Sequence, residues 1–133
     1  EIAGTKTPEV YMMGHSAGAI SIAAIAGKYK QIRRILLIAP TAPPPNGGKQ
    51  VVGKVLSIYD GEIYAVLGEL DNIVQKDDVK WFMETAVKAS RRESALVLGG
   101  DHYFREDDIF FHEVAMWAFK GKELPARYSL NFN

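Results

Sequence analysis

The 133-residue chain contains no cysteine and no net charge, because its 16 acidic side chains balance 16 basic ones. Without cysteine there is no disulfide, no thiolate metal site and no cysteine nucleophile. Balanced charge provides no overall field for binding nucleic acid or an anionic membrane. No run of about 18 apolar residues occurs, so we expect no transmembrane helix. No stretch has the pattern of a signal peptide, and a cytoplasmic location is the expectation.

Histidine is also scarce, with three in the chain, at His15, His102 and His112. They are scattered and lack a spaced pair of carboxylates, so we expect no metal site. No glycine-rich phosphate-binding motif is present, and we expect no cofactor. His112 lies in the last predicted helix, where a surface or half-buried position is the simplest interpretation.

Strand-like and helix-like segments alternate along the chain. Short apolar runs predict four strands, at residues 10–13, 34–39, 63–67 and 94–98. Helical periodicity predicts four helices, at residues 16–28, 49–58, 76–89 and 106–120. This alternation indicates an α/β fold with a mostly parallel sheet of about four strands and helices on both faces.

Three further features concern the helices and the tail. The helix at residues 16–28 is apolar nearly all round, which predicts that it is buried. Glu106, Asp107 and Asp108 would place negative charge in the first turn of the last helix, where it complements the helix dipole. Residues 124–133 have no periodicity and predict no regular element.

The strongest motif is Gly14-His15-Ser16-Ala17-Gly18, which matches G-x-S-x-G between a predicted strand and a predicted helix. A tight strand-to-helix turn lifts a serine hydroxyl out to where a base can reach it. Such a turn strains the serine backbone, and glycines on either side give it room. Ser16 is therefore the candidate nucleophile, and the Ala17 N–H is the candidate donor to an oxyanion. The His15 side chain is expected to pack behind the serine.

An acid and a histidine follow Ser16 in the order that this motif requires. Asp71 comes just after the third predicted strand, and His102 comes just after the fourth. The carboxyl ends of parallel strands share one edge of a sheet, so the three residues should meet there. His102 would act as the base and Asp71 would orient it. Glu69 is a competing acid, and Asp101 is adjacent to His102 but badly aimed.

On these motifs the chain resembles the α/β-hydrolases, and the resemblance covers roughly residues 8–120. It implies a triad of Ser16, Asp71 and His102, no cofactor, and esterase, lipase, amidase or peptidase activity. It implies a single domain over residues 1–133 that corresponds to the C-terminal half of the family's sheet and is incomplete at its N-terminus. The strand with Val10 and Met13 at its ends would then have an open edge, covered by a missing N-terminal half or by a second copy.

Two more consequences follow from the resemblance. The connection between the second and third strands is short, so no large cap is inserted there and the site should be open. The family's second oxyanion donor has no counterpart here. The leading hypothesis is hydrolysis of a small carboxylic ester through an acyl-enzyme. An amidase is the alternative, because residues 14–19 resemble those of arylformamidases. A non-catalytic binding or assembly module is the alternative from another class.

Overall fold

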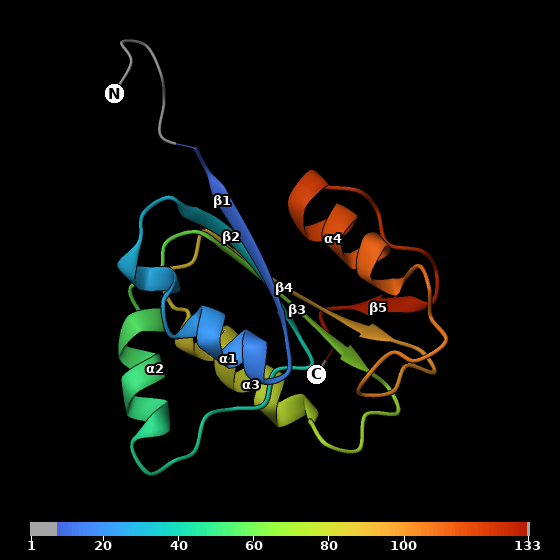
Figure 1. The fold of residues 1–133 in the computed structure, drawn as a ribbon, viewed down its shortest axis with the longest axis horizontal. Helices are drawn as coiled ribbons and strands as arrows, with labels where there is room; N and C mark the ends of the chain where they lie inside the picture. Colours follow the sequence, from blue (N-terminus) through green and yellow to red (C-terminus); the bar gives the residue numbers. More distant parts are fainter. Residues whose placement is uncertain (1–7, 133) are drawn as a thin grey trace.

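Five strands lie side by side in one sheet, in the order in which they occur along the chain (Figure 1). The structure is a computed structural model that describes residues 8–132. The first four strands are parallel, and the last runs antiparallel to its neighbour. Their bounds are β1 (Val10–His15), β2 (Ile32–Ile38), β3 (Glu62–Gly68), β4 (Arg91–Val97) and β5 (Tyr128–Leu130).

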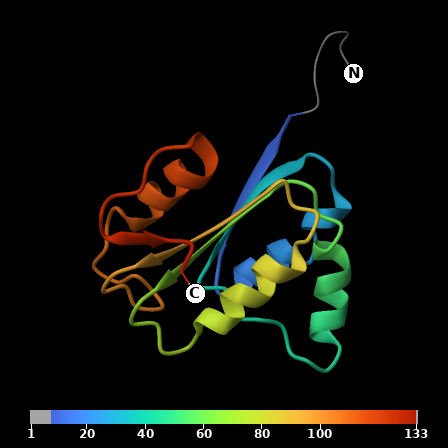
Figure 2. The ribbon, with the colours of Figure 1, turned by 180° about the vertical axis from the view of Figure 1, so that it is seen from behind.

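Helices cover both faces of the sheet, as the alternating pattern predicted. Three helices lie on one face and the fourth lies on the other, which Figures 1 and 2 show from opposite sides. They are α1 (Ala17–Ala23), α2 (Gly48–Leu56) and α3 (Lys76–Thr85) on the first face, and α4 (Phe110–Lys120) on the second. A short 3-10 helix (Ala26–Lys28) follows α1.

The core is built around the central strands β2 and β3. Ile35, Leu36, Leu37 and Ile38 are all 0% exposed, so both faces of β2 are buried. Burial on both faces is the reason that this strand is a continuous apolar run without polar alternation. Each fully buried side chain of this kind contributes about 1.5–3 kcal/mol to the free energy of unfolding. These strands therefore form a rigid platform for the loops at their carboxyl ends.

Several sequence predictions of the fold were wrong. The helix predicted over residues 16–28 ends at Ala23, and the one predicted over residues 76–89 ends at Thr85. Residues 124–133 contain a strand, β5, because pairing with β4 stabilises a segment too short to show periodicity. Helix α4 begins at Phe110, so Glu106, Asp107 and Asp108 lie before its first turn. Helix α1 is buried on one side only: Ala19, Ile22 and Ala23 are buried, while Ala17, Gly18 and Ser21 are exposed.

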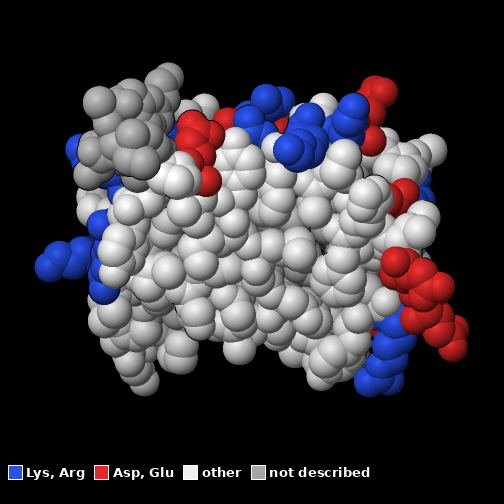
Figure 3. All heavy atoms as spheres, turned by 45° about the horizontal axis from the view of Figure 1, so that its top comes forward, with Lys and Arg blue, Asp and Glu red and all other residues white. Residues whose placement is uncertain are grey.

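The outer edge of β1 pairs with no strand among residues 8–132. Large apolar side chains are partly exposed along it, with Val10 at 37%, Tyr11 at 38% and Met13 at 44%. Figure 3 shows an uncharged area across the middle of one side of the molecule, with charged side chains around its margin. An open apolar edge strand is prone to pair with another chain. No helix among the described residues is long and apolar enough to cross a membrane.

Candidate active site

Ser16 lies on a strained turn between β1 and α1. Its φ is 56° and its ψ is −115°, a backbone conformation that residues with a side chain rarely adopt. The turn is so tight that a Cβ added at Gly14 would lie 2.6 Å from the carbonyl oxygen of Gly18 and 2.6 Å from the Ile22 side chain. The Gly14 position therefore requires glycine. Gly18 is not required for the same reason, because an added Cβ there would meet no atom of a neighbouring segment within 4 Å.

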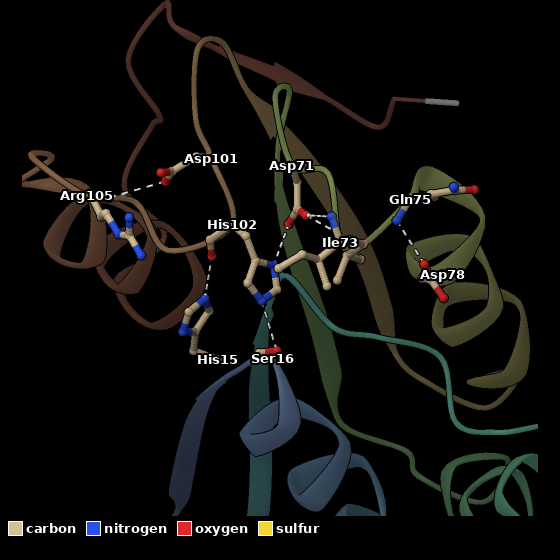
Figure 4. A network of polar contacts seen from close by, with 10 residues as sticks. His15, Ser16, Asp71, Ile73, Gln75, Asp78, Asp101, His102 and Arg105 are labelled. Carbon is tan, nitrogen blue, oxygen red and sulfur yellow. Dashed lines mark hydrogen bonds and ion pairs between the residues drawn. The ribbon is translucent and has the colours of Figure 1, made fainter.

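A chain of hydrogen bonds joins the three residues that the sequence singled out (Figure 4). The Ser16 Oγ lies 3.0 Å from the His102 Nε2, and the His102 Nδ1 lies 2.8 Å from the Asp71 Oδ2. Asp71 lies 55 positions after Ser16 in the sequence, and His102 lies 31 positions after Asp71. The three residues meet at the carboxyl edge of the sheet because each follows the end of a parallel strand. The Asp71 carboxylate accepts the hydrogen bond from the His102 Nδ1–H, which leaves the His102 Nε2 facing the Ser16 hydroxyl.

The Asp71 carboxylate is held in place by the turn that follows β3. Its side chain is 0% exposed and that of His102 is 4% exposed. Its second oxygen, Oδ1, accepts hydrogen bonds from the backbone N–H groups of Ile73 and Val74, each at 2.8 Å. Aspartate side chains commonly bond their own backbone two or three residues on, in an Asx turn. The carboxylate therefore has one oxygen fixed by backbone and the other directed at the imidazole.

Two glycines bring the loops of Asp71 and His102 together. A Cβ on Gly68 would meet the carbonyl oxygen of Gly100 at 2.4 Å, so the two backbones pack directly on each other. The Leu70 N–H donates to the Gly100 carbonyl at 2.8 Å. This contact sets the spacing from which the Asp71–His102 hydrogen bond follows. Sequence reasoning missed it, although a glycine at the end of each strand was a visible signal.

The competing acids are engaged elsewhere. The Glu69 carboxylate accepts from the N–H of Gly99 at 3.1 Å, so it supports the loop after β4 from outside the triad. The Asp101 carboxylate accepts from the N–H of Arg105 at 3.3 Å. His112 is exposed on α4. None of the three forms a hydrogen bond with the His102 ring, and Asp71 is the acid that the fold brings to it.

His15 lies next to His102, and it packs against the loop that carries His102 instead of behind the serine. Its Nε2 is 2.7 Å from the backbone carbonyl oxygen of His102. Its ring lies 5.3 Å from the His102 ring and about 6 Å from the rings of Tyr103, Phe104 and Phe111. The motif position that the sequence left without a chemical role thus contacts the proposed base.

Ala17 is the first residue of α1, immediately after Ser16. The N–H groups of the first helical turn have no acceptor within their own helix. The Ala17 N–H is therefore placed beside the serine, where an oxyanion would form, and the positive end of the helix dipole lies there as well. Ala17 is exposed, so this position is accessible from solvent.

The loop that carries His102 is anchored at its far end by Arg127, which the sequence analysis did not identify. Arg127 makes two hydrogen bonds to Asp107, at 2.7 and 3.0 Å, and another to Glu113. Tyr128, in β5, donates to Glu113 at 3.0 Å. The hydrogen bond to Asp107 raises the pKa of Arg127 above its ordinary value, and the bond to Glu113 adds to the shift. Asp107, before α4, and Glu113, within its first turn, therefore fasten the loop that carries His102 to the segment that leads into β5.

The surroundings of the site are open in the part of the chain that the structure describes. The connection between β2 and β3 contains α2 and loops, so no cap is inserted there. Exposed apolar side chains occur in the two loops that carry Asp71 and His102: Leu70 is 63% exposed, Ile73 51% and Tyr103 52%. No three histidine, aspartate or glutamate side chains among residues 8–132 gather in a way that could hold a metal ion.

Several solved structures share the fold of this chain. An esterase domain from Rhodothermus marinus superposes with a TM-score of 0.66 at 16% identity, over 78% of this chain and 56% of that one. Est1E from Butyrivibrio proteoclasticus has a TM-score of 0.59 at 16% identity, with 81% and 58% covered. A predicted hydrolase from Thermoplasma acidophilum has a TM-score of 0.60 at 16% identity, with 82% and 50% covered.

The chain has the α/β-hydrolase fold. At 16% identity the likeness shows the fold alone. A scan of protein-family models and a search of curated proteins both give no match. The chain spans between 50% and 58% of the length of the three solved proteins above.

Proposed function

We propose that the chain carries the catalytic triad of a serine hydrolase that cleaves carboxylic esters. The observation that supports this proposal is the continuous hydrogen-bonded chain from the Ser16 Oγ through the His102 ring to the Asp71 carboxylate. The strained backbone of Ser16 adds to it, since strain of this kind persists where the surrounding structure enforces it and often marks functional sites. The fold, shared with an esterase domain, fits this chemistry.

In the proposed reaction the Ser16 Oγ attacks the ester carbonyl carbon while His102 Nε2 accepts the hydroxyl proton. The carbonyl oxygen becomes an oxyanion, to which the Ala17 N–H donates. His102 then returns the proton to the departing alcohol, leaving the acyl group on Ser16. A water molecule attacks the acyl-enzyme, again with His102 as base, and releases the carboxylic acid. Asp71 keeps the His102 Nδ1 protonated and stabilises the imidazolium.

We assign the role of oxyanion donor to the Ala17 N–H. Loss of one of two donors typically lowers the rate about 100- to 1,000-fold. We therefore expect the chain by itself to turn over slowly, while its serine remains reactive toward a good acylating reagent. This expectation favours a labelling experiment over a turnover assay as the first test.

A fluorophosphonate probe tests the proposal, because it reacts with activated serines. We expect labelling of the 133-residue chain at Ser16, located by peptide mass spectrometry. Ser16→Ala should abolish the labelling, and His102→Ala should slow it at least 100-fold. The exposed residue Ser21 is a matched control, and Ser21→Ala should leave the labelling unchanged. Failure of the folded wild-type chain to label would sink the proposal and favour a binding or assembly module.

The choice between ester and amide substrates is made by comparing leaving groups on one acyl group. We expect p-nitrophenyl acetate to be hydrolysed and p-nitroacetanilide to be hydrolysed far more slowly. The open surroundings of Ser16 suit a small ester that needs no enclosed pocket. A faster reaction with the anilide would replace the esterase proposal with the amidase alternative.

A further inference from the structure

His15 makes a contact that the proposed reaction does not use. The acceptor, the backbone carbonyl oxygen of His102, has no proton, so the His15 Nε2 must donate across the 2.7 Å separation. No backbone N–H among the described residues donates to this carbonyl. The hydrogen bond to the main chain of His102 therefore comes from the His15 side chain.

This contact closes a ring of interactions around the reacting groups, visible in Figure 4. The Ser16 hydroxyl faces one nitrogen of the His102 ring, at 3.0 Å. The His102 backbone carbonyl accepts a hydrogen bond from His15, and His15 is joined to Ser16 by a peptide bond. The distance between nucleophile and base is therefore fixed twice, once through the His102 side chain and once through its backbone.

The His15 ring is itself prevented from turning away. It lies 6.2 Å from the Tyr103 ring, 6.1 Å from the Phe104 ring and 6.2 Å from the Phe111 ring, each in an edge-on orientation. Phe104 stacks on Phe110 at 3.7 Å and is 4% exposed, which ties this aromatic cluster to the core. A side chain packed in this way loses little further freedom when it holds a hydrogen bond.

We propose that His15 is a positioning residue that holds the His102 backbone, and with it the imidazole, at reaction distance from Ser16. The expected effect of His15 on the reaction rate rests on the proposed function. Its expected effect on the position of His102 rests on the contact geometry alone. The effect should fall on the chemical step, because the hydrogen bond of His15 goes to the backbone of His102, which carries the proposed base. A displacement of about 1 Å at such a site costs about 100-fold in rate.

Three variants distinguish the effect of the His15 hydrogen-bond donor from the effect of its aromatic ring. His15→Phe keeps an aromatic ring in the aromatic cluster and removes the donor, so kcat and the fluorophosphonate labelling rate should fall about 10- to 100-fold while KM changes less than about twofold. His15→Gln places an amide N–H at a similar reach and should restore both rates to within about threefold of wild type. His112→Phe, at an exposed position on α4, is the matched control and should change neither rate.

Two kinetic outcomes would overturn the proposal. The first is a kcat within twofold of wild type in His15→Phe. The second is an equal loss in His15→Gln and His15→Phe, because the hydrogen bond would then not be the cause. If the wild-type chain itself fails to label, the proposed function is wrong, and nitrogen NMR of the histidine rings decides the contact. We expect proton on the His15 Nε2, and His102 signals that shift in His15→Phe but not in His15→Gln. If the His102 signals are unchanged in both His15→Phe and His15→Gln, the proposed hydrogen bond does not exist in solution.

Discussion

The two ends of the parallel sheet use their polar side chains in different ways. At the carboxyl end, Asp71 and His102 are buried and each is held by backbone groups or by another site residue. At the amino end, Arg33 pairs with Asp60 at 2.8 Å, and these side chains are 34% and 68% exposed. Arg91 pairs with Glu93 there as well, and Arg91 is 60% exposed.

The difference separates polar groups that are buried and held by the fold from charges that lie on the surface. Exposed ion pairs are screened by water and contribute about 0–1 kcal/mol to stability. A buried carboxylate without partners would be strongly destabilising, so the fold surrounds Asp71 with donors. We therefore expect substitutions at the carboxyl end to change activity more than stability, and those at the amino end to change neither by much.

The largest expected effect is at Asp71. Asp71→Asn keeps an oxygen for the Ile73 and Val74 N–H groups but no longer fixes the proton on the His102 Nδ1. We expect kcat to fall by about 10⁴-fold, with a free energy of unfolding close to that of wild type. Steady-state kinetics and urea unfolding measure the two quantities. Activity within tenfold of wild type would remove the distinction between the two ends of the sheet.

Gly68→Ala tests the backbone contact between the two site loops. The added Cβ would lie 2.4 Å from the Gly100 carbonyl oxygen, and because that atom is backbone the loops must move apart. We expect about 1–3 kcal/mol of destabilisation and at least 100-fold loss of labelling at Ser16. Gly53→Ala is the matched control within α2: its nearest neighbours would be 3.7 Å away, so it should stabilise the chain by about 0.5–1 kcal/mol. Full labelling in Gly68→Ala would contradict the role of this contact.

Arg127→Met tests whether the far anchor of the base loop matters to the site. The substitution leaves Asp107 and Glu113 without their cation, and we expect a loss of about 1–3 kcal/mol of stability. The labelling rate should fall less than about tenfold, because the contacts of His102 with Asp71 and His15 remain. Hydrogen exchange of residues 99–109 should speed up. If exchange in this loop is unchanged, Arg127 anchors β5 and not the loop.

The smallest expected effect is at Asp60 on the amino end. The hydrogen bond from Arg33 lowers the pKa of Asp60, so its stabilisation is present above the ordinary aspartate pKa and fades as the pH falls through the lowered value. We expect Asp60→Asn to cost at most about 0.5 kcal/mol at pH 7 and nothing near pH 2, with kcat unchanged. Urea unfolding at both pH values measures this. A loss of activity in this variant would show that the amino end reaches the site.

The sequence predicted the parts of the fold that depend on local patterns. Apolar runs located the four parallel strands, because a strand buried on both faces has no polar alternation. The G-x-S-x-G motif predicted Ser16 on a turn between strand and helix, and its positive φ agrees with that prediction. Chain order and strand ends were enough to bring Asp71 and His102 to the same edge, since parallel strands end together.

Other features depend on contacts between distant residues and have no local signature. β5 exists because β4 offers an edge to pair with, and the Arg127 pairs exist because β5 lies beside the loop before α4. The His15 contact with His102 joins residues 87 positions apart, so no window of sequence contains it. The order of strands and helices along the chain and the residue types of the site follow from the sequence. The distances between those residues were decided by tertiary packing, because backbone contacts such as Gly68 on Gly100 form only in the folded chain.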